Sequence, residues 1–147
     1  MKRRPELQRD VIVDIPKDQE RRLGCAGKML KPSRASVEAL VKKVPRGKVI
    51  TTPFLRKSLA ASHDAQVTCP FLTKQALAAI AEDAESKAPF WRVVAENGEM
   101  IRYYPGGGTE QARRLKDESV MIEARLGKYR VMNLRDARWT ESAEKDD

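Results

Sequence analysis

The sequence predicts an α+β domain in which a helix-turn-helix unit is followed by a β-hairpin wing. Two observations support this prediction. Apolar residues recur with the period of amphipathic helices through the middle of the chain, and from residue 90 onward the pattern becomes strand-like and is broken by an Asn-Gly pair. The chain has 147 residues, of which 41% are hydrophobic, which is enough for one domain with one modest core.

Residues 1–32 are expected to form a basic N-terminal arm, because prolines and glycines interrupt them and no period is sustained. Residues 1–34 carry a net charge of +5. A β-branched run at 11–15 is compatible with a short strand or with a strip that packs on the domain. The domain itself is predicted over residues 33–134. Residues 135–147 are expected to form an acidic tail, since the last nine residues have a net charge of −3.

Three helices are predicted in the first half of the domain. The first covers residues 37–44, where valines and a leucine recur at positions i, i+3, i+4 and i+7. A short β-branched run over residues 49–51 leads to the second helix, for which Thr52 is the candidate N-cap and Pro53 the first helical residue. The third is expected over residues 71–84, and the second and third together make the helix-turn-helix unit.

Two β-hairpins are predicted in the second half of the domain. Asn97-Gly98 separates the β-prone runs 90–94 and 100–104, and this pair favours a type I′ turn because both central residues need a positive φ. This hairpin is the expected wing. A short helix with Thr109 as its cap follows, and a final hairpin is expected over residues 120–132.

The formal net charge of +8 favours a polyanionic partner, because cations neutralise phosphates and release their counterions. Charge also serves solubility alone in many proteins, so this alternative stays open. A basic cluster surrounds the first two predicted helices and the loop between them, and is either a phosphate-contacting surface or a solvated face. Its members are Lys42, Lys43, Arg46, Lys48, Arg56 and Lys57.

The composition argues against several other classes of protein. A mean hydropathy of −0.59 and short apolar runs argue against a membrane-spanning helix. No apolar signal segment follows the basic first residues, so a cytoplasmic protein is expected. Two cysteines without a Cys-x-x-Cys pair and a single histidine favour neither a zinc site nor a disulfide framework. We therefore expect no metal and no cofactor.

Five segments carry a family resemblance, in the order of the family's own motifs. Val44-Pro45-Arg46-Gly47-Lys48-Val49-Ile50-Thr51 is similar to an Ile-Pro-x-Gly-x-Val-x-Thr motif, and Pro89-Phe90-Trp91-Arg92-Val93-Val94 is similar to Pro-Cys-His-Arg-Val-Val. Further on, a Gly, a Tyr-x-Gly-Gly and a Leu-x-x-Glu position are matched by Asn97-Gly98, Tyr104-Pro105-Gly106-Gly107 and Leu115-Lys116-Asp117-Glu118. Over residues 36–119 the chain thus resembles the C-terminal domain of the alkylguanine-DNA alkyltransferases (methylated-DNA-protein cysteine methyltransferases) and their non-catalytic relatives, the alkyltransferase-like proteins.

Two departures from the family bear on activity. In the family, a cysteine attacks the alkyl group, and an adjacent histidine with a later glutamate keeps it as thiolate. Phe90 and Trp91 stand at the cysteine and histidine positions, so Glu118 at the glutamate position is left without its histidine. The resemblance therefore implies a protein that is not an enzyme. Such a protein would bind double-stranded DNA, would sense alkylated DNA or assist DNA repair, and would have a repair protein as a candidate partner.

The resemblance also implies a set of site residues. Lys74, or Gln75 if the register slips by one, stands where the family's recognition helix inserts an arginine into the duplex. Acidic residues end that helix, so its N-terminal half is expected to dock. The candidate nucleic-acid-binding residues are Lys74, Gln75, Thr51, Thr52, Lys48, Arg56 and Lys57, and those of the pocket are Phe90, Trp91, Arg92, Tyr104, Gly106 and Gly107.

Each pocket residue has an expected role. Phe90, Trp91 and Tyr104 are expected as walls for a flipped base, since aromatic rings stack on bases. Phe90 and Trp91 are also compatible with core-facing strand positions. The Gly106-Gly107 pair would let the backbone approach a ligand, and Arg92 is expected to be mainly structural.

Two other functions stay open. The domain is also compatible with binding RNA, a ribonucleoprotein or a protein partner, with the basic arm as the anchor for a polyanion. The third hypothesis is an enzyme that uses Cys69, since a helix N-terminus lowers a thiol pKa and His63 is six residues away. A small buried hydrophobic side chain is the alternative role of that cysteine.

Overall fold

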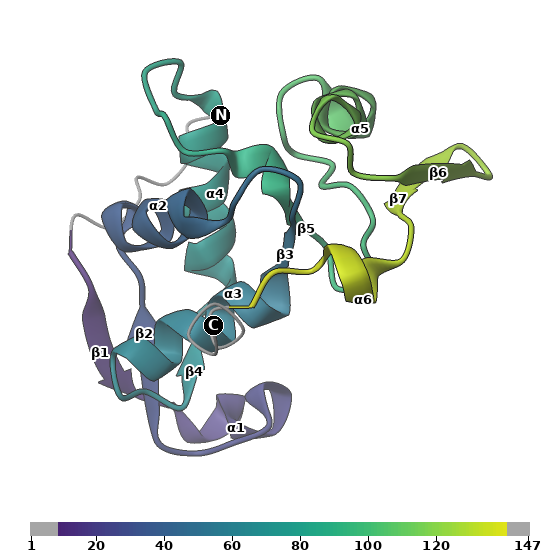
Figure 1. Ribbon diagram of the computed structural model, residues 1–147. Coiled ribbons are helices and arrows are strands. Elements are labelled where there is room, and N and C mark those ends of the chain that lie inside the picture. Colours follow the sequence, from purple (N-terminus) through teal and green to yellow (C-terminus); the bar gives the residue numbers. More distant parts are fainter. Residues whose placement is uncertain (1–8, 141–147) are drawn as a thin grey trace.

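The structure is a computed structural model and describes residues 9–140. Within these residues it is a mixed α+β fold with three small sheets, as the α+β class predicts (Figure 1). The ends of the predicted arm and tail, residues 1–8 and 141–147, lie outside the described residues. The elements in chain order are β1 (Val11–Asp14), α1 (Lys17–Leu23), β2 (Lys28–Lys31), α2 (Arg34–Lys43), β3 (Ile50–Thr51), α3 (Thr52–Ser62), β4 (Val67–Thr68), α4 (Pro70–Glu82), the short 3₁₀ helix η1 (Phe90–Arg92), β5 (Val93–Val94), α5 (Gly107–Asp117), β6 (Ile122–Arg125), β7 (Lys128–Val131) and α6 (Leu134–Ala137).

The segment predicted as an arm is folded between residues 9 and 32. β1 pairs antiparallel with β2, and β2 pairs in parallel with β4, so the sheet order is β1-β2-β4. The short strand expected near residue 11 is confirmed as β1. Asp10 joins this segment to two helices. Its carboxylate accepts a hydrogen bond from Ser36 Oγ of α2 at 2.6 Å and lies 3.1 Å from His63 Nε2 at the end of α3.

The three predicted helices are confirmed as α2, α3 and α4, with shifted ends. The N-cap of α3 is Thr51 rather than the predicted Thr52. The Thr51 hydroxyl accepts a hydrogen bond from Phe54 N at 3.4 Å, and Pro53 is accommodated in the first helical turn. The helices share the main hydrophobic core, to which they contribute Val37, Leu40, Val41, Leu55, Leu59, Ala76, Leu77 and Ile80.

The predicted wing across Asn97-Gly98 is wrong, because residues 90–94 and 100–104 do not pair as strands. Residues 90–92 form η1, and β5 pairs in parallel with β3 instead of antiparallel with residues 100–104. A turn is present, but it is not the predicted type I′ turn. Gly98 N donates to Ala95 O at 2.9 Å, so Glu96 and Asn97 are its central residues, and of the Asn97-Gly98 pair only Gly98 has a positive φ, of 88°. The sequence pattern therefore identified a turn, but not the strands that pair around it.

Gln111 of α5 explains this difference. Its Nε2 donates to the carbonyl oxygens of Trp91 at 2.9 Å and Val93 at 2.8 Å, and its Oε1 accepts from Ile101 N at 2.7 Å. Buried backbone groups must be paired, and here one buried side chain pairs them on both sides of the expected hairpin. The two segments consequently need no ladder between them.

The final hairpin is confirmed as β6 and β7. The strands pair antiparallel with Arg125 opposite Lys128, and Leu126 and Gly127 lie between them with φ values of 54° and 78°. Figure 1 shows the hairpin projecting from the body of the fold beside α5. A second, smaller core under the hairpin consists of Val49, Val94, Leu115, Val120 and Val131.

No helix within residues 9–140 is long and apolar enough to cross a membrane.

Candidate nucleic-acid interface

Three of the predicted pocket residues form an aromatic cluster. The Phe90 ring packs edge to face on Trp91, with 5.3 Å between centroids, and on Tyr104, with 5.1 Å. Tyr104 is 2% exposed, and its hydroxyl has no hydrogen-bond partner. Burial raises the pKa of Tyr104 well above its ordinary value. The structure thus brings the three rings together, and those of Phe90 and Tyr104 pack directly on each other.

Glu118 is bound by the residues next to Phe90. Trp91 Nε1 donates to Glu118 Oε2 at 3.0 Å. Arg92 donates to both carboxylate oxygens, from Nε at 2.9 Å and from Nη2 at 2.7 Å. Burial raises the pKa of the Glu118 carboxyl, but the hydrogen bonds from Arg92 and Trp91 outweigh burial and leave that pKa below its ordinary value. The carboxylate therefore stays charged and fixed.

Arg92, which was expected to be mainly structural, contacts three elements of the fold. Besides Glu118, it binds the backbone oxygen of Val44 through Nη1 at 2.7 Å, so it connects the end of α2, η1 and the end of α5. Gln111, which the sequence reasoning missed, fixes the same segment from α5. A polar side chain beside Ala112 and Leu115 on the buried face of that helix is the signal that would have identified it.

Arg114 covers part of the aromatic cluster from α5. Its guanidinium lies 4.9 Å from the ring centroid of Trp91 and 5.3 Å from that of Phe90. Glu110 holds the guanidinium by accepting from Arg114 Nε at 2.9 Å. These cation–π contacts stabilise the cluster and occupy ring surface that a base would otherwise use.

Lys74 lies at a second aromatic residue. Its Nζ is 5.3 Å from the ring centroid of Tyr103, which the sequence reasoning also missed. Burial raises the pKa of Tyr103 to about 12, and the nearby charge of Arg56 opposes this rise. The exposed side chain of Lys74 on α4, Arg56 on α3 and Tyr103 on the loop before α5 therefore form one cationic and aromatic cluster. We call it the Lys74 cluster.

Gln75 lies apart from the Lys74 cluster. It lines a groove between α4 and the N-terminal segment, together with Pro16 and Phe71. Its Oε1 is buried and has no hydrogen-bond partner. Of the two register alternatives, the structure places Lys74 beside Tyr103 and Gln75 in this groove.

The remaining predicted cations serve different parts of the fold. Lys48 Nζ donates to the backbone oxygen of Asp136 in α6 at 2.7 Å. Arg46 Nη2 donates to that of Asp117 at the end of α5, also at 2.7 Å. Lys57 is exposed on α3. The predicted basic cluster is thus not one surface. Arg56 and Lys57 lie on α3, the helix that carries the charge near Tyr103, whereas Arg46 and Lys48 bind backbone oxygens elsewhere.

The predicted backbone positions have local roles. Thr51 is buried and caps α3, while Thr52 is half-buried in its first turn. Gly106 precedes α5 with a φ of 83°, and a Cβ there would lie 2.6 Å from Glu110 Cβ. Gly107 has a φ of 66°, and a Cβ added at Gly107 would have no other atom within 4 Å. Glycine at 106 is therefore favoured by both packing and backbone conformation, and glycine at 107 by backbone conformation alone.

The structure does not pair Cys69 with His63. His63 Nδ1 contacts Leu59 O at 2.8 Å and its Nε2 contacts Asp10, so both ring nitrogens are engaged elsewhere. Cys69 and Cys25 are free cysteines, and no group of three potential ligands for a metal ion occurs in the part of the chain that the structure describes.

Two solved structures of S. pombe proteins are similar to this chain. S. pombe Atl1 in complex with damaged DNA containing O6-carboxymethylguanine is 25% identical with a TM-score of 0.58, over 73% of this chain and 94% of that chain. S. pombe ATL in complex with DNA is 26% identical with a TM-score of 0.55, over 73% and 94%. No family model and no curated protein sequence matches the chain. The structural match therefore confirms the resemblance to the alkyltransferase-like proteins that the sequence indicates.

Proposed function

We propose that this protein is a non-catalytic alkyltransferase-like protein that binds duplex DNA and recognises alkylated guanine in it. The hydrogen bond from Trp91 Nε1 to Glu118 Oε2 is the observation that carries the proposal. An indole N–H only donates, so it takes no proton from a nucleophile. With Phe90 at the nucleophile position, the site offers aromatic surface in place of an activated thiol.

DNA docks on this protein as on a winged helix-turn-helix domain, with α3 and α4 as the helix pair. The N-terminal half of α4 faces the duplex, because its C-terminal end carries Glu82 and Asp83. Lys74 and Arg56 contact phosphates or fill the groove, and Tyr103 provides a ring beside them. The likeness to two proteins solved in complex with DNA supports this arrangement.

Lesion binding requires a movement in the aromatic cluster. A flipped base stacks on a ring face, and the Phe90 ring now packs on Tyr104 and under Arg114. The base therefore displaces Tyr104 or Arg114 from Phe90. Opening a packed aromatic contact lowers the affinity by the free energy of that contact, so recognition is weaker than for a preformed pocket.

Matched duplexes with and without one O6-alkylguanine test this function, alongside single-stranded RNA, at two salt concentrations. We expect tighter binding to the lesion duplex, and the labelled alkyl group should stay on the DNA. Equal, steeply salt-dependent binding to all three ligands would overturn lesion recognition and leave only charge-driven binding, whereas tighter binding to the RNA would favour the RNA or ribonucleoprotein alternative. A repair-protein partner and a cytoplasmic location stay predictions.

A further inference from the structure

The tip of the β6–β7 hairpin carries an apolar side chain in an unfavourable place. Leu126 is 93% exposed, although it is a large hydrophobic residue. It also has a φ of 54°, a conformation that asparagine, aspartate and glycine adopt far more easily than leucine. A turn that served only to reverse the chain would be more stable with a small polar residue. Strain and exposure together point to a contact made by the side chain.

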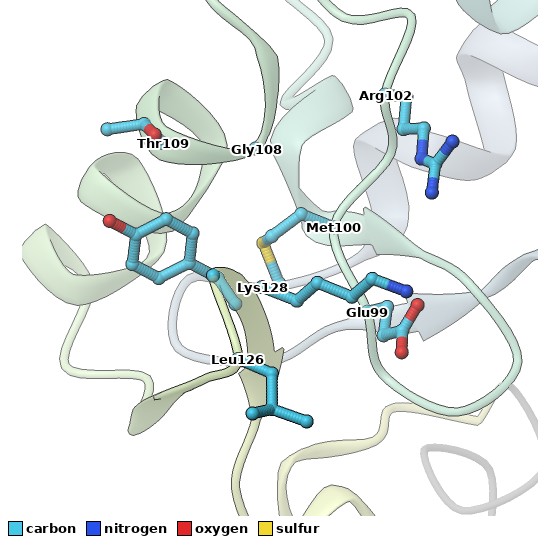
Figure 2. A pocket seen from close by; sticks show the side chains of 9 residues that line it. Glu99, Met100, Arg102, Gly108, Thr109, Leu126 and Lys128 are labelled. Atoms are coloured by element: carbon cyan, nitrogen blue, oxygen red, sulfur yellow. The ribbon is translucent and has the colours of Figure 1, made fainter.

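Lack of space does not explain the exposure of Leu126. A cavity of about 390 Å³ lies between the hairpin tip, the segment around Met100 and the start of α5 at Thr109. Leu126 is among the residues that line this cavity, and Figure 2 shows its side chain directed away from Met100 and Thr109 on the far walls. The turn thus leaves the side chain in solvent, where a partner can contact it.

The charges around the tip identify the chemistry of that partner. Arg125 and Lys128 flank the turn and are exposed, and Arg102 lies on the opposite wall of the cavity. Glu99 is the acidic residue of the cavity lining, and Figure 2 shows its carboxylate on the same side as the Lys128 ammonium group. Three cations against one acid favour a polyanion.

The segment around Arg102 links the cavity beneath the tip to the Lys74 cluster. Arg102 lines that cavity, and the next residue, Tyr103, contacts Lys74 of α4. Cations therefore lie at both ends of this connection. One duplex docked on α4 is expected to reach both.

We propose that the β6–β7 hairpin is the DNA-contacting wing of this protein, with Leu126 as an apolar wedge in the groove and Arg125 and Lys128 on the flanking phosphates. This inference rests on the proposed binding of duplex DNA. Leucine is one of the side chains that groove-binding proteins insert between base steps, at the expense of some unstacking. The wing proposed here is therefore the β6–β7 hairpin rather than the hairpin that was expected at residues 90–104.

Leu126→Asn tests the wedge, because asparagine accepts the positive φ and should keep the turn. We expect at least about a fivefold loss of duplex affinity from removing the wedge, with a melting temperature equal to or above that of the wild type. A structural role alone would instead change the melting temperature and leave the affinity unchanged. Met121→Gln is the matched control, since Met121 is 61% exposed near the base of the hairpin.

Arg125→Gln with Lys128→Gln tests the phosphate contacts. Each lost contact is expected to reduce the slope of log affinity against log salt by about 0.9. Lys87→Gln with Arg135→Gln removes the same charge from exposed positions outside the cavity, and should leave the slope unchanged. If the wild type binds the duplex and the tip variants bind equally well, the wing is overturned while the proposed function stands. If the wild type fails to bind any duplex, both fall.

Discussion

Trp91 and Glu118 are joined by a hydrogen bond of 3.0 Å between Nε1 and Oε2, which ties η1 to the end of α5. Arg92 reinforces the pair with two further hydrogen bonds to the same carboxylate. The side chains of Arg92 and Glu118 are only 14% and 5% exposed, so water and salt screen their interaction little. What resembles a catalytic relay in sequence is a buried structural unit.

Glu118→Gln should destabilise the protein by about 3 kcal/mol, because Arg92 keeps a buried charge without its partner. Urea unfolding at neutral pH measures this loss. Glu110→Gln is the control, since Glu110 pairs with Arg113 and Arg114 at the surface and its loss should cost far less. Similar losses in the two variants would contradict the structural role of Glu118.

Acid should remove the same contribution in the wild type. The pKa of Glu118 is lowered in the folded protein, so its contribution is complete above the ordinary value of 4.5 and is lost as the pH falls through the folded-state pKa. The stability difference between the wild type and Glu118→Gln should therefore shrink below pH 4.5. Unfolding curves from pH 7 down to about pH 3 measure it. A difference that stays constant over this range would exclude the ionised carboxylate as its source.

Gln111→Ala should cost about 3 kcal/mol, because it removes the partner of three backbone groups, two of them in buried hydrogen bonds and one in a partly buried one. Gln75→Ala is the matched control. Gln75 Oε1 is buried without a hydrogen-bond partner, so its removal should cost less than about 1 kcal/mol. Thermal or urea unfolding measures the stability of both variants. An equal loss of stability would contradict the role of Gln111 in pairing these backbone groups.

Phe90→Cys should not gain alkyl transfer. The new thiol would lack a base, because the neighbouring Trp91 donates its only N–H to Glu118. Mass spectrometry after incubation with an O6-alkylguanine duplex measures transfer. An alkylated residue at position 90 would show that the site activates a thiol by another route.

Lys74→Ala should weaken duplex binding by about fivefold at low salt and reduce the salt slope by up to about 0.9. Lys48→Ala is the control of equal charge, because Lys48 Nζ is bound to the backbone oxygen of Asp136. It should lower stability rather than affinity. Titration of a labelled duplex at several salt concentrations measures both variants, and unchanged binding by Lys74→Ala would remove α4 from the interface.

The helices and the last hairpin were predictable because their signals are local. The apolar period of α2, the proline at the start of α4 and the glycine in the turn at 126–127 each lie within one element. The hairpin at residues 90–104 failed because its outcome depends on distant residues. β3 takes β5 as its parallel partner, and Gln111 satisfies the backbone on both sides. Local sequence contains neither fact.

The candidate site was predictable in part for the same reason. The motif order identified Phe90, Trp91 and Tyr104, and the structure brings their rings together. Charge alone did not distinguish Lys48, which holds α6, from Lys74, which lies at Tyr103. The partners of a cation are decided by tertiary structure, because long flexible side chains reach carbonyls far away in the sequence.

The parallel pairing of β2 with β4 changes what the N-terminal segment is for. β4 lies in the connection between α3 and α4, and the backbone there is held by bonds from Gln66 N to Lys28 O at 2.9 Å and from Cys69 N to Leu30 O at 2.8 Å. By pairing with β4, the N-terminal segment fixes the backbone that connects α3 to α4. Deleting residues 1–32 would therefore do more than remove the basic residues that were expected to bind a polyanion. It would also remove the strand that pairs with the connection between α3 and α4, the helix proposed to dock on the duplex. Lost binding after such a truncation would therefore reflect changed geometry as much as lost charge.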